Sequence, residues 1–146
     1  MTATSHSLVG ASLACLIPNP LIAIPLAFTS NFILDTIPHW DVGIGWHNRP
    51  KMQTFVFAGI DVLLGLSLSF LIFAQKVDPL YLLLMIFVAT FADWAEAPYL
   101  FLGWDIPPFN WFYKFQSKIH HRDGTLLGIM IQVIIVLPLI ILAYTR

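Results

Sequence analysis

Histidines and carboxylates recur in this chain at positions where the sequence is otherwise apolar. Asn31, Asp35 and His39 are four residues apart, and Asp93 and Glu96 are three apart, so each set would share one face of a helix. Mixed histidine and carboxylate donors are typical of zinc sites, and they also suit manganese or ferrous iron. We therefore predict a site for a divalent metal ion, with zinc as the first choice and manganese or iron as alternatives.

Composition indicates the environment in which these residues lie. Hydrophobic residues make up 58% of the 146 residues and charged residues only 10%, whereas soluble domains carry about 25% charge. A water-soluble surface cannot be built from so few charges, so much of the surface must face lipid. The length is that of a single domain, residues 1–146. Because the net charge is −1 and no basic cluster is dense, we expect no nucleic-acid partner.

Five apolar runs supply the elements that must position the polar residues. They are Leu8–Ile17, Leu21–Ile37, Thr54–Ala74, Leu80–Leu102 and Leu126–Tyr144. With a rise of about 1.5 Å per residue against a hydrocarbon core of about 30 Å, at least three runs span, the second just spans and the first is short. Backbone polar groups must be satisfied inside lipid, so we predict an all-α, polytopic transmembrane bundle of about four or five helices. The first two helices are expected to form a short hairpin.

One aromatic and basic segment, Gly103–Asp123, precedes the last run. It contains three tryptophan or tyrosine residues, Trp104, Trp111 and Tyr113, together with lysines and an arginine. Aromatic and basic side chains of this kind favour the headgroup region of a bilayer. We predict an interfacial helix here, or an extension of the last span.

Alternating the helices up and down brings the polar residues to one side of the membrane. That side receives all five histidines and every acidic residue except Asp78. A charged side chain inside a span costs about 2.5–3.5 kcal/mol. The spans contain no Lys or Arg to pair with the buried acids. A bound cation is the partner that we expect instead.

Roles follow from these positions. We predict five metal ligands: His6, Asp35, His39, Asp61 and His120. Asp93 and Glu96 are the predicted catalytic pair, in which one carboxylate takes a proton from water while the other could be a ligand. Substrate binding is assigned to Asn31, Asp41, Lys118 and Arg122.

Structural alternatives stand beside several of these roles. Asp35 and His39 could cap a helix end or lie behind the true ligands. Asp61 could bond to a neighbouring helix. Asp41 could be a solvated loop acid.

Four stretches resemble a known family. They are Thr4-Ser5-His6 followed by Gly10, residues 31–41 (NFILDTIPHWD), residues 93–98 (DWAEAP) and residues 115–120 (FQSKIH). They are similar to the bacterial inner-membrane proteins described as membrane-bound metal-dependent hydrolases, which are distantly similar to zinc-dependent phospholipase C. The resemblance implies phosphoester hydrolysis. The chain departs from the family at Asn31, where a histidine is frequent, and at Ala92, where a proline is frequent.

The expected function is therefore hydrolysis of a phosphoester in a lipid or lipid-linked substrate, by metal-activated water. A proton- or cation-handling transporter and a non-catalytic, metal-stabilised membrane protein are the alternatives. Five of the seven basic residues lie on the side of the site, which predicts a cytoplasmic site in a bacterial-type inner membrane. Small residues in the first and third helices would also permit a homo-oligomer.

Overall fold

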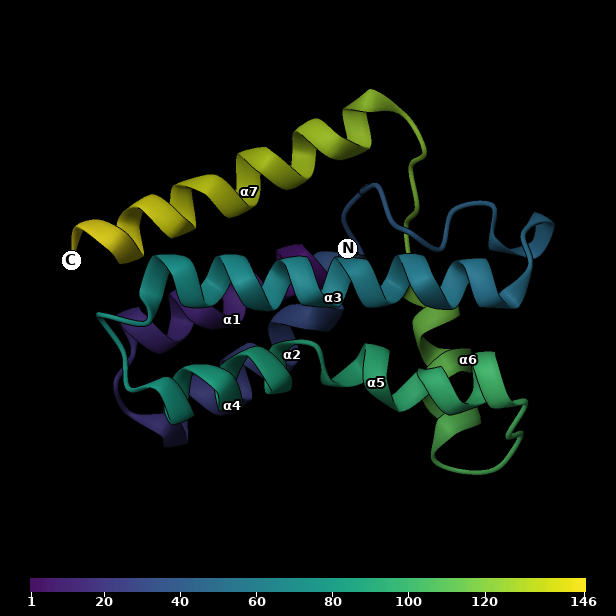
Figure 1. Cartoon of the computed structure of the whole chain (residues 1–146), viewed down its shortest axis with the longest axis horizontal. Helices are drawn as coiled ribbons and strands as arrows, with labels where there is room; N and C mark the ends of the chain where they lie inside the picture. Colours follow the sequence, from purple (N-terminus) through teal and green to yellow (C-terminus); the bar gives the residue numbers. More distant parts are fainter.

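The computed structural model describes residues 1–146 and is entirely helical. The chain forms seven α-helices. Figure 1 shows how they are arranged, with the helix nearest the N-terminus packed among the others. A 3₁₀ turn, η1 (Trp46–Asn48), and a π-helical turn, η2 (Pro98–Leu102), complete the elements. The α-helices are α1 (Ala3–Leu16), α2 (Pro20–Asp35), α3 (Lys51–Phe73), α4 (Pro79–Ala89), α5 (Phe91–Ala97), α6 (Phe109–Ile119) and α7 (Leu126–Thr145).

Two helices, α3 and α7, are long and apolar enough to cross a membrane. A third span would form if α4 and the following segment, α5 with η2, together cross the membrane. The chain bends by 58° at the break between α4 and α5. The predicted all-helical, membrane-inserting class is therefore supported. The predicted bundle of about four or five helices is not confirmed, because the chain forms seven helices and breaks the fourth apolar run at Thr90.

The N-terminal hairpin differs from its prediction in length. Residues 17–19 separate α1 from α2, and the Asn19 side chain accepts a hydrogen bond from the Leu21 N–H as an N-cap. We expected residues 21–37 to just span the bilayer. That expectation is wrong, because α2 ends at Asp35 after 16 residues, before Pro38.

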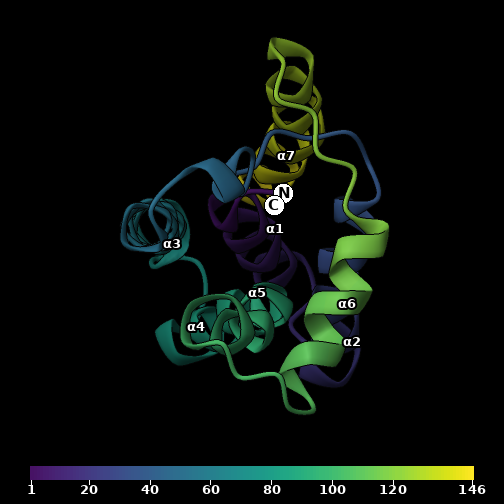
Figure 2. The ribbon, with the colours of Figure 1, turned by 90° about the vertical axis from the view of Figure 1, so that its right-hand side faces the viewer.

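Helix α1 lies in the middle of the molecule although it is not especially apolar. Figure 2 shows α1 surrounded by the other helices, and it contacts α2, α3, α4 and α7. Its polar residues Ser5, His6, Ser7 and Ser12 are all buried. Polar residues thus lie inside the molecule and apolar helices lie around them. This distribution is expected of a protein whose solvent is lipid.

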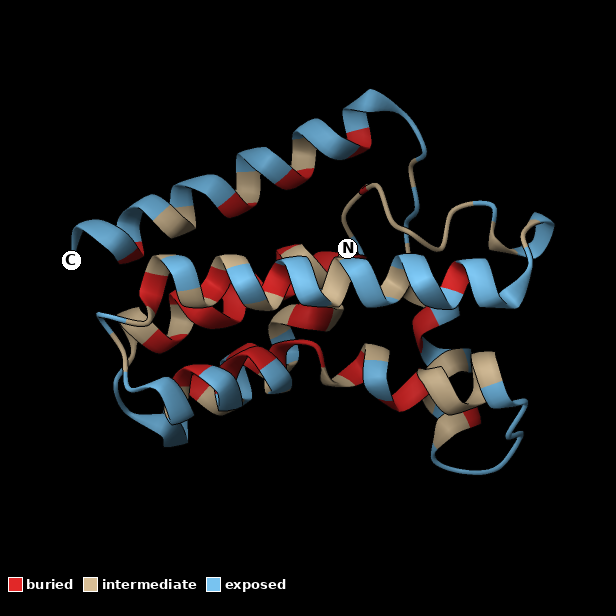
Figure 3. Ribbon diagram, viewed as in Figure 1, coloured by how far each residue is buried: buried red, intermediate tan, exposed pale blue.

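Small residues allow this close packing. A Cβ added to Gly10 would lie 2.6 Å from the Met85 carbonyl oxygen of α4, so the two backbones nearly touch. Figure 3 shows the buried residues on the facing sides of α1, α2 and α4, while the outer faces of α3 and α7 are exposed. Only 11% of the most apolar stretch of α3 is buried inside the protein. Most of that helix is therefore available to lipid.

Helix α6 lies across the other helices (Figure 2). It is at the end of the molecule that holds the loop between α2 and α3, which we call the loop end (Figure 1). It packs on α5 and η2 through aromatic pairs such as Tyr99–Tyr113, whose rings are stacked 4.4 Å apart. Trp111 is exposed whereas Gln116 is buried. This helix falls inside the segment that we predicted as interfacial, and its exposed aromatic face suits that prediction.

The close contact at Gly10 gives a test of the packing. Gly10→Val should lower the free energy of unfolding by about 1–3 kcal/mol, because its side chain would overlap the α4 backbone. Gly59→Val is the matched control, since a Cβ at Gly59 meets no atom within 4 Å. Thermal denaturation in detergent measures both variants. Equal stability of the two would contradict the central placement of α1.

Candidate functional site

The Asp35 carboxylate is the centre of a buried polar cluster. Its side chain has no exposed surface, and three histidines surround it. Asp35 Oδ1 lies 3.1 Å from His6 Nε2 and 3.9 Å from His39 Nε2, and Asp35 Oδ2 lies 2.8 Å from His120 Nε2. The Met1 nitrogen also contacts Oδ1. The structure thus brings together four of the five predicted ligands.

Backbone pairing, rather than a helix face, places His39. The predicted helix through residues 31, 35 and 39 ends at Asp35, so His39 lies in the following loop. The His39 N–H donates to the His121 carbonyl (3.1 Å), and the His39 carbonyl accepts from the Asp123 N–H (2.7 Å). A third bond joins the His121 N–H to the Asp35 carbonyl (2.9 Å). These bonds hold the segment after α6 against the segment after α2.

The His39 ring is held as a metal-binding imidazole usually is. Its Nδ1 donates to the Ile37 carbonyl at 2.7 Å, which leaves Nε2 with its lone pair directed at the cluster. Burial lowers the pKa of His39 to about 4, so the ring is neutral at physiological pH. A hydrogen bond from the second ring nitrogen to a carbonyl is the common way of orienting a metal-ligating histidine.

Three nitrogen or oxygen atoms near Asp35 that could bind a metal ion are buried without a hydrogen-bond partner. They are His6 Nδ1, His39 Nε2 and Asp93 Oδ2. Buried polar atoms are nearly always paired, because leaving one unpaired costs about 1–3 kcal/mol. Such atoms on histidines and a carboxylate fit a metal ion as the missing partner.

Two overlapping groups have the geometry to hold a metal ion. The first consists of Asp35, His39 and His120, and the second of His6, Asp35 and Asp93. Within each group the ligand atoms lie within 4.8 Å of one another. Both groups use Asp35 and draw donors from different elements of the chain. The predicted metal site is thus possible in this fold, while the identity of the ion rests on donor chemistry alone.

The Gln116 amide contacts both Asp35 and the amide of Asn31. Gln116 Nε2 lies 3.2 Å from Asn31 Oδ1 and 3.4 Å from Asp35 Oδ2, and Asn31 Nδ2 donates to the Ala89 carbonyl at 2.9 Å. Asn31, predicted to bind substrate, is buried with both polar atoms engaged, and it holds the Gln116 amide that reaches Asp35. We did not predict Gln116. Its spacing of four residues before His120 is the signal that could have identified it.

Asp41 and Arg122 form an ion pair at the edge of the cluster. Arg122 Nε donates to Asp41 Oδ2 at 2.8 Å, and the Gly43 N–H donates to Oδ1 at 2.9 Å. Burial would raise the pKa of Asp41, but the Arg122 guanidinium, the Met1 amine and the Gly43 hydrogen bond together outweigh it, so the pKa is lowered. Arg122 also reaches His120 Nδ1 at 3.3 Å. Lys118, also predicted to bind substrate, is exposed on α6 and lies outside the cluster.

Asp61 lies outside both groups and caps α1 instead. Its carboxylate accepts hydrogen bonds from the Ala3 N–H (2.7 Å), the Thr4 N–H (3.2 Å) and the Thr4 hydroxyl (2.6 Å). These N–H groups belong to the first turn of α1, where they have no partner within the helix. The alternative of a hydrogen bond to a neighbouring helix therefore describes Asp61, and the structure gives no support for ligation.

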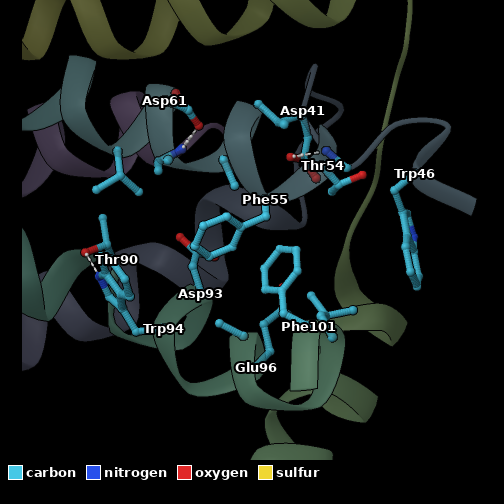
Figure 4. Close-up of a pocket in the computed structure, with 18 of the residues that line it drawn as sticks. Asp41, Trp46, Thr54, Phe55, Asp61, Thr90, Asp93, Trp94, Glu96 and Phe101 are labelled. Atoms are coloured by element: carbon cyan, nitrogen blue, oxygen red, sulfur yellow. Dashed lines mark hydrogen bonds between the residues drawn. The ribbon is translucent and has the colours of Figure 1, made fainter. Parts of the chain in front are cut away.

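A groove between α3 and α5 leads to the cluster. Its volume is about 410 Å³, and 13 of its 24 lining residues are hydrophobic. Figure 4 shows Asp93 and Glu96 of α5 beside Phe55 of α3 and Phe101 of η2, all four of which line the groove. Asp93 and His120 belong to both the groove and the cluster. Glu96 lines the groove and has no hydrogen bond or ion pair.

No protein-family model, curated protein or solved structure matches this chain. The chemistry of its own residues is therefore the basis for a function.

The capping role of Asp61 can be tested by stability. Asp61→Ala should lower the free energy of unfolding by about 0.5–2 kcal/mol, as loss of an N-cap does. The loss should be the same with and without added zinc, as measured by thermal denaturation. A loss that appears only when zinc is present would identify Asp61 as a ligand and contradict the capping role.

Proposed function

We propose that this protein is a membrane-embedded, metal-dependent hydrolase that cleaves a phosphoester in a lipid or lipid-linked substrate. One observation carries the proposal: a buried histidine and carboxylate cluster, with unpaired donor atoms, opens into an apolar groove beside a membrane-spanning helix. The resemblance to membrane-bound metal-dependent hydrolases favours the same chemistry.

Some residues of the site would bind the metal ion, and others would take part in the reaction. Asp35, His39 and His120 would hold an ion in one group, and His6, Asp35 and Asp93 would hold an ion in the overlapping group. Zinc is favoured by these donors, with manganese or iron as alternatives. A divalent ion bound there would polarise a phosphoryl oxygen and make water more acidic.

Glu96 is the group that we assign to proton transfer. It faces the groove beside Asp93, and its carboxylate is not engaged by any other side chain. In hydrolysis, water attacks phosphorus while its proton passes to Glu96. The ester P–O bond then breaks, and the leaving alcohol takes that proton. Arg122, next to His120, would bind a phosphoryl oxygen.

We further propose that the site faces the cytoplasm in a bacterial-type inner membrane. Lys76 and Arg146 lie together at the end opposite the cluster, where they line a small hollow with Cys15. The other five basic residues belong to the loops and helix at the cluster end: Arg49, Lys51, Lys114, Lys118 and Arg122. The excess of Lys and Arg follows the positive-inside rule.

Turnover on a panel of phospholipids and lipid phosphates, with and without EDTA, tests the activity. Glu96→Gln should reduce the rate by about 10²–10⁴-fold, as loss of a general base does, and EDTA should abolish it. Asp105→Asn is the matched control, because that carboxylate is on the same end of the molecule but largely exposed. Its rate should equal that of the wild type.

Two results would contradict the proposal. One is turnover that survives both EDTA and Glu96→Gln. The other is metal-dependent thermal stability without turnover on any member of the panel, which would instead indicate a structural metal.

A further inference from the structure

The walls of the groove are apolar and belong to helices that face lipid. On α3 the lining includes Phe55, Ala58, Gly59 and Leu63, and α3 is one of the two helices able to cross a membrane. Phe55 and Leu63 are 56% and 63% exposed, although they are large and apolar. In a membrane the medium beside these side chains is hydrocarbon, so the groove is open to lipid along its side.

Small residues on the two walls create the space. Ala58 and Gly59 of α3 face the groove from one side and Ala97 of α5 from the other. A Cβ added to Gly59 would meet no atom within 4 Å. The helices are thus held apart here, whereas at Gly10 and Gly65 an added Cβ would overlap a neighbouring helix. A volume of about 410 Å³ falls within the range of about 300–1,000 Å³ that is usual for ligand pockets.

The length of the groove matches one lipid chain. Its α3 wall runs from Lys51 to Leu63, which is about 18 Å at the rise of an α-helix. Half of a hydrocarbon core is about 15 Å thick, and this is the depth that the chain of one leaflet covers. The groove therefore has room for an acyl chain lying along α3.

Charge distinguishes the two ends. The cationic lining residues, Lys51 and Arg122, lie at the loop end, where Lys51 begins α3 and Arg122 pairs with Asp41. Thr90, Trp94 and Leu63 line the other end, where no Lys or Arg lies. Of the two carboxylates there, Asp61 accepts hydrogen bonds from the start of α1, and Asp93 belongs to the cluster. Phosphate is attracted to Lys and Arg near a membrane surface. The cationic end suits an anionic headgroup, which leaves the end without Lys or Arg for the chain terminus.

We propose that the groove between α3 and α5 binds one acyl chain of a membrane lipid, which enters sideways from the bilayer and carries its phosphate to the cluster. The phosphate end of this proposal rests on the proposed function. The binding of the chain does not, because it depends only on the apolar walls.

Photolabelling tests the binding without turnover. The probe is phosphatidic acid with a diazirine in the middle of one acyl chain, added to the full-length protein in nanodiscs with EDTA present. We expect labelled peptides to contain groove residues of α3 and α5. Gly59→Phe, which fills the groove, should lose most of that labelling. Ile60→Phe adds the same bulk to a residue of α3 that is 57% exposed and outside the groove, and should keep it.

The outcomes separate the two proposals. Unchanged groove labelling in Gly59→Phe, with a thermal stability equal to that of the wild type, would overturn the acyl-chain site, as would wild-type labelling confined to the outer face of α3. A diacylglycerol probe with the same chain should label the groove less than phosphatidic acid. Equal labelling would overturn the phosphate end alone. Because EDTA is present throughout, failure of metal binding or of hydrolysis leaves these results unchanged.

Discussion

A carboxylate buried among imidazoles is the constraint on which the rest of this structure depends. Burying a charged Asp35 costs several kcal/mol unless partners surround it. The partners come from three separate places: His6 on α1, His39 after α2 and His120 after α6. They can meet only if the polar helix α1 lies in the middle of the molecule and α6 crosses its loop end. The arrangement of the helices is therefore tied to the burial of this one side chain.

Several atoms of the cluster still lack a hydrogen-bond partner, and this favours a bound cation. Lone pairs on His6, His39 and Asp93 have no hydrogen-bond donor, and an ion can satisfy several at once because coordination draws on lone pairs from several directions. The groove between α3 and α5 leads to this cluster, and we propose that lipid enters through it. A site with buried donors at its floor and apolar walls suits a substrate that is itself amphiphilic.

Much of this cluster could be predicted from the order of the apolar runs, because alternating them brings His6 and His120 to the same side. The remainder depends on contacts that local sequence does not encode. His39 is placed by backbone bonds to a segment more than 80 residues away, not by a helical repeat. Asp61 lies in an apolar run of the sequence, as a buried metal ligand would. Its role as a cap becomes visible only when the first turn of α1 is found beside it. The break at Thr90 splits a run that is apolar on both sides.

The metal content of the purified protein bears most closely on this view of the site. Inductively coupled plasma mass spectrometry would be applied to wild-type protein in detergent, purified without chelator, and to Asp35→Ala, which removes the carboxylate common to both groups. We expect stoichiometric zinc, or another divalent metal, in the wild type and its loss in the variant. Wild-type protein without metal, or equal metal in both proteins, would contradict an Asp35-centred metal site.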